Sequence, residues 1–359
     1  MKRNYGIDLL KMLLMFMIVV LHVIGLGGVL SAPDIRAANY CTAWTLEVVC
    51  YCAANCYALI TGYVHYNRKY RIHSLLMICL QMLFYSVLIS GIFWIVKPEK
   101  FTLDALLNTL FPVSRSVHWY ISSYVGLYLF IPLLNAGAEA MTRNQAKYYL
   151  AASMIIFSII PTFLMTDPYK LSGGYSTIWL MHLYLTGAFV KKFGWETRLS
   201  RKQLVMIFSA AILVTLGVMF SLEAVTRMIF GEPRYSNLLV SYVSPTIVLS
   251  GLSLFLYFLT IRPSERIVKY LRVLSPAAFG VTIIHVHPYI YELWANRFVF
   301  LAQWNPLVMA LGIMVCALGI YVPCLLIDYL RIRLFDKLHC KEIIEKISNR
   351  IIPDYVSEM

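Results

Sequence analysis

The chain has 359 residues, of which 60% are apolar and 14% are charged, and its formal net charge is +13. This composition excludes an ordinary soluble domain and indicates a membrane protein, so the lipid bilayer is its first expected partner. The sequence has no basic–aromatic surface motif, so a nucleic-acid partner is not expected.

Ten stretches are long and apolar enough to cross a bilayer as helices, which predicts an all-α, polytopic membrane bundle. Together they use most of the chain and leave no room for a soluble domain of ordinary size. The predicted spans are residues 7–30, 42–64, 74–96, 118–136, 146–165, 176–193, 203–222, 238–260, 274–294 and 306–330.

Basic residues indicate the orientation of this bundle. Of the 31 Lys and Arg residues, 22 fall in the segments that an even number of spans places on the same side as the two ends. By the positive-inside rule this side is cytoplasmic, so both termini are predicted to be cytoplasmic. The net positive charge is then mostly explained by the Lys and Arg residues of the cytoplasmic segments, which orient the protein in the membrane. The first span is too long, and lacks the small-residue cleavage site, to be a removed signal peptide.

Ionisable residues interrupt the first predicted span. Lys11 and His22 lie 11 residues apart, which is three helical turns plus about 20°, so both side chains project from one face. Asp8 lies close to the same face, and Asp8 with Lys11 also fits a simple ion pair at the membrane interface. Intramembrane ionisable residues usually serve function, and His22 is therefore the first candidate catalytic residue, with Lys11 beside it.

The second predicted span contributes Glu47, which lies at a depth similar to that of His22. A carboxylate beside an imidazole fixes its tautomer and strengthens it as a base, so Glu47 is a candidate catalytic partner of His22. The alternative is an interfacial carboxylate at a shallow helix end. Cysteines in the same span match no disulfide framework or zinc spacing, and no metal site is expected.

A basic segment, Arg68-Lys69-Tyr70-Arg71, follows the second span. Arg68 and Arg71 are suited to bidentate contacts with the phosphates of a nucleotide-like donor. The same residues also fit the ordinary basic character of a cytoplasmic loop, so composition alone leaves both readings open.

Aromatic residues and histidines mark the later spans. His118 and Trp119 begin the fourth span, where an aromatic cluster either anchors the helix at the interface or stacks against sugar rings. His182, His285 and His287 add imidazoles at membrane depth. Together with His22 they make a polar cavity plausible, although a lone histidine among helices more often bonds a neighbour.

The last residues, 334–359, alternate apolar and charged side chains with helical spacing. They predict an amphipathic helix on the cytoplasmic surface, separate from the membrane domain of residues 1–333.

The chain resembles the acyltransferase 3 family of integral membrane acyltransferases, which modify surface glycans, over about residues 3 to 330. His22 stands where the family's motif of a basic residue, ten residues and histidine expects it, with Lys11 in place of the more usual Arg. Two further departures are Thr61 in place of Ser and Thr282 in place of Tyr. The matching segments are Arg3-Asn4, Ile7-Asp8-Leu9-Leu10-Lys11, Thr61-Gly62-Tyr63, Arg68-Lys69-Tyr70-Arg71, His118-Trp119-Tyr120 with Tyr128 and Pro132, and Phe279-Gly280-Val281 with Ile284-His285.

The resemblance implies transfer of an acyl group, most often acetyl, from cytoplasmic acyl-CoA to a hydroxyl of a cell-envelope or exported polysaccharide. Acyl-CoA would be a donor substrate, and no permanently bound cofactor is expected. His22 would be the general base or a transient acyl carrier, and Lys11 would stabilise the donor or its entrance. Arg68 and Arg71 would contact the donor, and His118, Trp119 and His285 the acceptor, in a multi-pass protein of the cell membrane.

Two other functions remain open from the sequence. One is a transporter that exports a polysaccharide or small solute without acyl-transfer chemistry, although the chain lacks the paired broken spans of inverted-repeat transporters. The other is a catalytically inactive scaffold within a glycan-assembly complex.

Overall fold

The computed structural model describes residues 3–33 and 35–351, and within these ranges every regular element is a helix. The α-helices, in chain order, are α1 (Tyr5–Ile24), α2 (Ala37–Tyr51), α3 (Ala53–His65), α4 (Ile72–Val96), α5 (Leu103–Leu110), α6 (Trp119–Ala140), α7 (Arg143–Met154), α8 (Ile160–Leu164), α9 (Thr177–Phe193), α10 (Arg201–Phe230), α11 (Pro245–Leu259), α12 (Glu265–Leu274), α13 (Ala278–His285), α14 (Pro288–Trp294), α15 (Pro306–Lys337) and α16 (Cys340–Ile351). A π-helical segment, Ile155–Ile159, joins α7 to α8, and short 3₁₀ turns lie at Pro98–Lys100, Ser172–Gly174, Trp195–Thr197, Ser275–Ala277 and Val299–Gln303.

The all-α membrane bundle predicted from the sequence is confirmed. Eight helical segments of the described chain are long and apolar enough to cross a membrane: Tyr5–Ile24, Ala37–His65, Ile72–Val96, Trp119–Ala140, Arg143–Leu164, Arg201–Phe230, Glu265–His285 and Pro306–Lys337. The two other predicted spans correspond to α9 and α11, which have 17 and 15 residues. The count of ten and the cytoplasmic side of the termini stay predictions.

The predicted span 274–294 is not one helix, and this part of the prediction is wrong. α13 ends at His285, and α14 begins at Pro288 after His287 adopts an extended backbone with ψ of 132°. A residue that precedes proline is disfavoured in the helical region, and proline lacks the N–H that would continue the hydrogen-bond ladder. The chain therefore breaks just beyond His285.

The first predicted span also ends early. α1 begins at Tyr5, where the Asn4 side chain accepts a hydrogen bond from the Gly6 N–H, and ends at Ile24 instead of Leu30. Gly28 follows with φ of +90°, a left-handed conformation that an L-residue with a side chain rarely adopts. The glycine-rich turn thus stops the helix two residues beyond His22.

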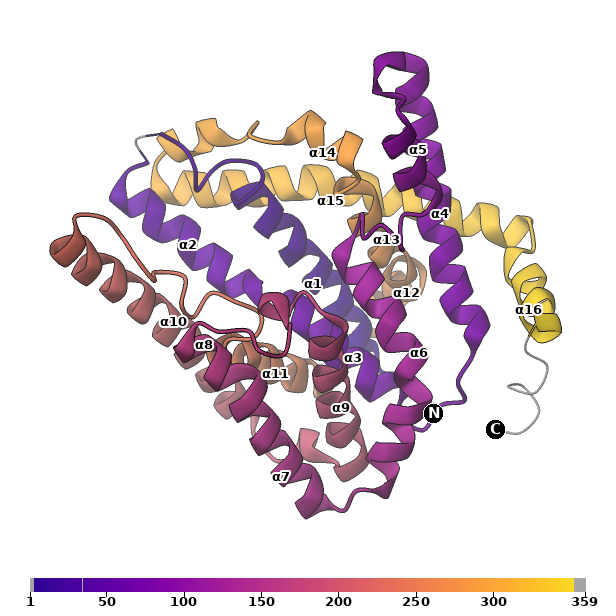
Figure 1. Cartoon of the computed structure of the whole chain (residues 1–359), viewed down its shortest axis with the longest axis horizontal. Helices are drawn as coiled ribbons and strands as arrows, with labels where there is room; N and C mark the ends of the chain where they lie inside the picture. The colour runs from indigo at the N-terminus through magenta and orange to yellow at the C-terminus, as the bar shows by residue number, and fades with distance from the viewer. Residues whose placement is uncertain (1–2, 34, 352–359) are drawn as a thin grey trace.

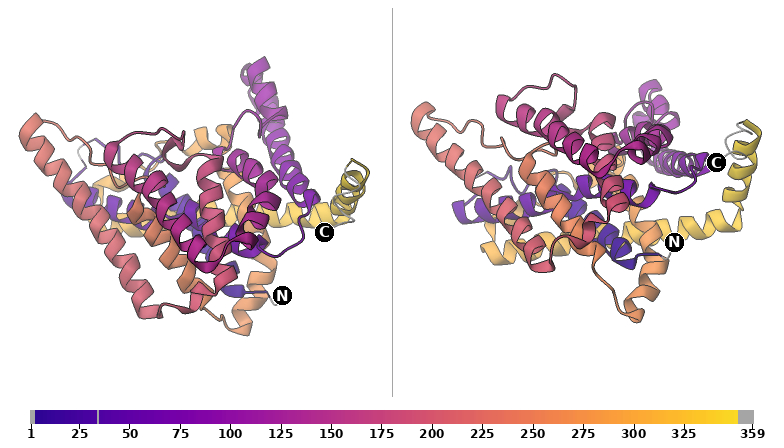
Figure 2. Two further views of the ribbon diagram at one scale, coloured as in Figure 1. Left: turned by 60° about the horizontal axis from the view of Figure 1, so that its bottom comes forward. Right: turned by 90° about the horizontal axis from the view of Figure 1, so that it is seen from below.

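α1 is the central helix of the bundle. It packs against α2, α3, α11, α13 and α15, and most of its side chains are buried. Figures 1 and 2 show α10 along one edge of the molecule and α4 with α5 projecting from another. Apolar side chains on the outer helices, such as Leu133, Leu213 and Leu311, are exposed, as a lipid-facing surface requires.

Two glycines bring α3 and α9 into backbone contact. A Cβ atom on Gly62 would lie 1.9 Å from the Tyr184 carbonyl oxygen, and one on Gly187 would lie 2.1 Å from the Leu59 carbonyl oxygen. Small residues at helix crossings allow such close approach within membranes. Gly62 belongs to the Thr61-Gly62-Tyr63 segment, so packing explains why glycine is needed there.

A buried ionic cluster joins α4, α13 and α15. The Asp328 carboxylate accepts hydrogen bonds from Gln81, Tyr85 and Arg331 at 2.8–2.9 Å. It also lies so close to Gly280 of α13 that a Cβ atom there would be 2.1 Å from Asp328 Cγ. Because the charge is paired and its oxygens are hydrogen-bonded, the cluster is compatible with full burial.

The domain boundary at residue 333 stays a prediction, and one helix runs across that position. α15 continues to Lys337, and α16 then turns away at the end of α15 (Figure 2). α16 packs on α4, where His73 Nε2 lies 3.2 Å from Glu345 Oε1. Residues 352–359 of the predicted amphipathic tail lie outside the described residues, and its cytoplasmic position stays a prediction.

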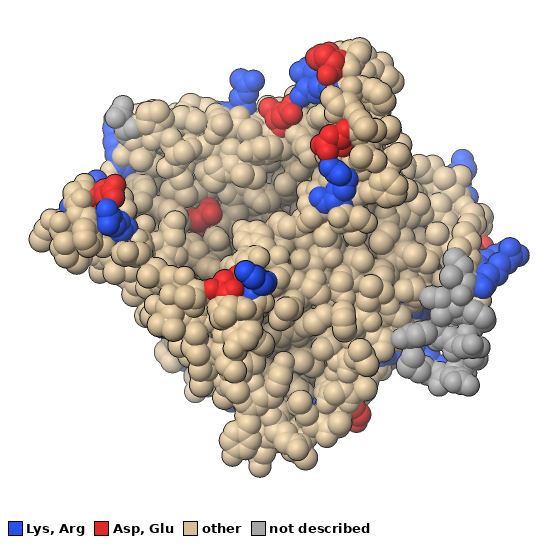
Figure 3. Space-filling view, viewed as in Figure 1, with Lys and Arg blue, Asp and Glu red and all other residues tan. Residues whose placement is uncertain are grey.

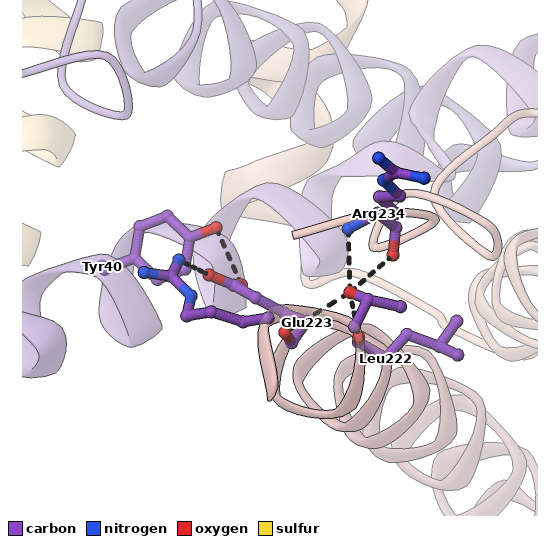
Figure 4. A network of polar contacts seen from close by, with 6 residues as sticks. Tyr40, Leu222, Glu223 and Arg234 are labelled. Atoms are coloured by element: carbon purple, nitrogen blue, oxygen red, sulfur yellow. Dashed lines mark hydrogen bonds and ion pairs between the residues drawn. The ribbon is translucent and has the colours of Figure 1, made fainter. Parts of the chain in front are cut away.

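Polar contacts fasten the far end of α10 to the start of α2. The Tyr40 hydroxyl donates to Glu223, which also pairs with Arg227, and Thr226 bonds to the backbone of Arg234 (Figure 4). The face shown in Figure 3 is otherwise largely uncharged, with an acidic side chain lying inside a hollow of that face.

Candidate active site

Two cavities lie one after the other along α1. The Lys11 cavity has a volume of about 400 Å³ and is lined by α1, α3, α4, α6 and the start of α13. The His22 cavity has a volume of about 250 Å³ and lies further along the same helix. Lys11 and His22 therefore each line a cavity on the same helix, and their functional role stays a prediction.

Three aromatic side chains are shared by the two cavities: Tyr57, Tyr120 and Phe279. The Tyr57 hydroxyl donates to the Lys11 carbonyl at 2.6 Å, and the ring centroids of Tyr57 and Tyr120 are 6.3 Å apart. These side chains form a partition between the cavities. The sequence analysis did not assign Tyr57 any role, because nothing in the local spacing singles out one tyrosine among 25.

Charged side chains gather in the Lys11 cavity. Arg3, Asp8 and Lys11 all line it, and Asp8 accepts from Arg3 Nε at 2.6 Å and from Ser275 at 3.1 Å. The alternative reading of Asp8 and Lys11 as a simple pair is therefore incomplete, because Asp8 is held by Arg3 and Ser275. Lys11 lines the cavity beside this pair.

Arg68 and Arg71 lie in the loop between α3 and α4, near the start of α1 (Figure 1). Both side chains are exposed, and neither lines the Lys11 cavity. Arg68 nevertheless interacts electrostatically with Lys11 and with His65, and both of these residues line the cavity. The Tyr128 hydroxyl fixes the same loop by donating to the Arg71 carbonyl at 3.0 Å. The loop therefore lies beside the Lys11 cavity.

His22 is paired with His285 of α13. Nδ1 of His22 lies 2.8 Å from Nε2 of His285, and Nδ1 of His285 lies 2.6 Å from the Val281 carbonyl oxygen. A carbonyl only accepts, so Nδ1 of His285 carries a proton, and in the neutral ring its Nε2 is an acceptor. Nδ1 of His22 must then donate, which assigns the lone pair of His22 to Nε2.

This assignment makes Nε2 of His22 the basic nitrogen of the site. The described residues supply no hydrogen-bond partner for Nε2, and His22 lines the cavity, whereas His285 lies behind it. His285 is itself fixed by the Trp294 indole N–H, which donates to its carbonyl at 3.1 Å. The arrangement presents an oriented imidazole base to whatever occupies the cavity.

The predicted partner of His22, Glu47, is replaced by His285 in the structure. α2 does pack against α1, as expected. Glu47, however, has a buried Oε2 without a hydrogen-bond partner among the described residues, and its nearest charged or polar neighbours include Tyr51 and Tyr242. The reason is geometric. The Glu47 side chain lies near Tyr51 and Tyr242, whereas the His22 side chain points to His285 of α13.

His118 and Trp119 both line the His22 cavity, as a substrate-contacting role requires. His118 precedes the first residue of α6, and its buried Nε2 has no hydrogen-bond partner in the described chain. The Trp119 ring packs against Tyr175 at 4.4 Å and Tyr242 at 5.7 Å between centroids. Tyr242 is a further lining residue that the sequence analysis missed, since it lies in an irregular segment before α11.

Of the other candidate histidines, His182 is buried between Trp179 and Phe157 and lines neither cavity. His287 caps the start of α14, where its Nδ1 accepts from the Tyr289 N–H at 3.3 Å, and it interacts electrostatically with His118 of the His22 cavity. Within the described ranges, no group of three His, Cys, Asp or Glu residues is arranged to hold a metal ion.

The fold and these cavities define a multi-pass helical membrane protein with an oriented histidine in an internal cavity. In a comparison with protein families, the family model of an acyltransferase domain matches residues 4–326, nearly the whole chain. The chain belongs to the acyltransferase 3 family and is a membrane acyltransferase. No curated protein and no solved structure matches it.

Proposed function

We propose that this protein is an O-acyltransferase of the cell membrane that moves an acyl group, most often acetyl, from cytoplasmic acyl-CoA to a hydroxyl of an envelope or exported polysaccharide. The observation that carries the proposal is the basic Nε2 of His22, oriented by His285 and directed into a cavity. Membership of the acyltransferase family supplies the reaction class.

In the proposed reaction, His22 Nε2 takes the proton of the acceptor hydroxyl as its oxygen attacks the thioester carbonyl carbon. The carbon–sulfur bond breaks, and the CoA thiolate takes the proton from His22 and leaves as the free thiol. The Nδ1–H of His22 keeps its hydrogen bond to His285 throughout and helps to hold the ring while it is positively charged. A transient acyl-histidine would use the same nitrogen.

The Lys11 cavity is the proposed donor side. Arg3 and Lys11 line it, and Arg68 lies close enough to act on both Lys11 and His65, so these basic side chains are the proposed contacts of the phosphates of acyl-CoA. The His22 cavity, with His118 and Trp119, is the proposed acceptor side. Transfer between them passes the partition of Tyr57, Tyr120 and Phe279.

Polysaccharide or solute export without acyl transfer is the competing function. It accounts for a path through the bundle, but it gives no role to the pairing that assigns a free lone pair to His22. A transport pathway requires no oriented base.

The deciding experiment compares membranes that carry the wild-type protein or His22→Ala. The wild type is expected to consume acetyl-CoA and form base-labile ester on the surface glycan, and His22→Ala to lower the rate by about 100- to 10,000-fold at equal protein level. Normal ester formation by His22→Ala would rule out the mechanism. Glycan movement without any ester in the wild type would establish export instead.

A further inference from the structure

One face of α2 carries a row of side chains that the proposed reaction does not use. Tyr40, Trp44, Glu47 and Tyr51 follow one another at spacings of four, three and four residues, which places them along one face of the helix. All four side chains are half-buried. We call these four residues the α2 stripe.

The stripe contains buried polar atoms without ordinary partners. Glu47 Oε2 and Trp44 Nε1 are buried and have no hydrogen bond of normal geometry among the described residues. Trp44 has only a weaker interaction with the Tyr40 hydroxyl, whose ring lies 6.2 Å away. Buried polar atoms are nearly always satisfied in folded proteins, so an acceptor and a donor one turn apart indicate a ligand with hydroxyl groups.

The stripe leads into the His22 cavity. Tyr51 packs against Tyr242 with ring centroids 4.9 Å apart, and Tyr242 packs against Trp119 at 5.7 Å. Tyr242 and Trp119 both line the His22 cavity. Packed aromatic rings thus run from Tyr51, one turn beyond Glu47, to the wall of the His22 cavity.

Aromatic faces combined with a few polar groups suit a ring that is apolar on its faces and hydroxylated at its edge. A carboxyl group forms hydrogen bonds with hydroxyl groups, and the four residues of the stripe include no cation that would hold the phosphates of a phospholipid headgroup or of CoA. An acyl chain would leave both buried polar atoms unpaired.

We propose that the α2 stripe binds a sugar ring of the acceptor chain next to the ring that is acylated, with Glu47 and Trp44 holding its hydroxyl groups. This inference rests on the proposed function. It extends the proposed acceptor site so that it binds at least one sugar ring beyond the ring that is acylated. Glu47 then determines acceptor affinity and does not act on the base, in agreement with its separation from His285 and His22.

The test measures ester formation against the concentration of glycan fragments released from the host envelope and stripped of esters by mild base. Trp44→Phe removes the N–H and keeps an aromatic ring, and Glu47→Gln keeps the shape and replaces the carboxyl group with an amide. Trp44→Phe is expected to raise the half-saturating glycan concentration about 2- to 12-fold, and Glu47→Gln about 10-fold or more, with the maximal rate retained.

Matched controls are Trp195→Phe and Glu99→Gln, which change the same residue types away from the stripe and the cavities. Both are expected to give the wild-type glycan curve. Wild-type curves for the stripe variants would overturn the inference. So would a lowered maximal rate at unchanged half-saturation, because that result would assign Glu47 to the chemistry.

A binding measurement separates this inference from the proposed function. The same fragments are titrated by calorimetry into the full chain in lipid nanodiscs without acyl-CoA. If wild-type membranes form no ester, the proposed function fails, yet weaker fragment binding by Glu47→Gln than by Glu99→Gln would still support the stripe. Equal binding by these two variants would overturn it.

Discussion

At the scale of single residues, His22 depends on a partner that lies 263 residues away in the chain. The sequence identified His22 and Lys11 because their spacing along one helix follows directly from helix geometry. It could not identify His285 as the partner, because contacts between distant helices depend on how the helices pack. Glu47 was predicted from its similar depth along the neighbouring helix, but its side chain does not point toward His22.

Removing His285 tests the orientation of the base. His285→Ala leaves Nδ1 of His22 without its acceptor, so the tautomer with the lone pair on Nε2 loses about 1–3 kcal/mol of support and kcat is expected to fall about 5- to 150-fold. His285→Gln offers a new acceptor and should recover part of that loss. The measurement is the pH profile of kcat in both variants.

A merely structural role for His285 would change protein yield and leave this profile unshifted. Wild-type kcat in His285→Ala would show that His22 needs no partner.

At the scale of elements, the sequence predicted most helices, because long apolar runs have few alternatives in a membrane. It misplaced ends where one residue decides the backbone. Pro288 was visible in the sequence, yet the apolar run of residues 274–294 concealed the break that it imposes. The break matters to the site, since it ends α13 at His285.

The contact between α3 and α9 can be tested at a single glycine. Gly62→Ala places a methyl group where the Tyr184 carbonyl lies, so the helices must separate, and the protein is expected to lose about 1–3 kcal/mol of stability. The readout is the midpoint of thermal unfolding in detergent.

Gly217 of α10 provides the control, because a Cβ atom there meets open space. Gly217→Ala should unfold at the wild-type temperature or slightly above it, since alanine favours the helix. If both variants unfold together, close packing at Gly62 is not what limits stability.

At the scale of the whole molecule, the sequence predicted the bundle and its family, and the structure adds an order along its central helix. The loop with Arg68 and Arg71 lies near one end of α1, and His22 lies near the other. Only the assembled bundle shows that two cavities with shared lining residues lie one after the other between these two ends of α1.

This separation predicts a selective effect on the donor. Replacing Arg68 and Arg71 with Gln is expected to raise KM for acyl-CoA, by about 1.5–3 kcal/mol for each charged hydrogen bond lost, and to leave KM for the glycan nearly unchanged. Initial rates measured over both substrate concentrations separate the two effects.

The double Lys variant discriminates recognition from topology. Lysine keeps the charge that orients the loop and loses the planar fork that matches phosphate. A persistent rise in KM for acyl-CoA would support phosphate recognition, whereas wild-type kinetics in the Lys variant would leave the two arginines with a topological role alone.

The pairing of His22 with His285 also determines when, during synthesis of the chain, the His22 ring can be oriented. α1 enters the membrane first, but its histidine has no acceptor until α13 has been synthesised and packed beside it. A nascent or interrupted chain that stops before α13 therefore contains Lys11 and His22 but lacks the residue that orients the His22 ring. The proposed base therefore gains its acceptor only after the last third of the protein has packed against the first helix.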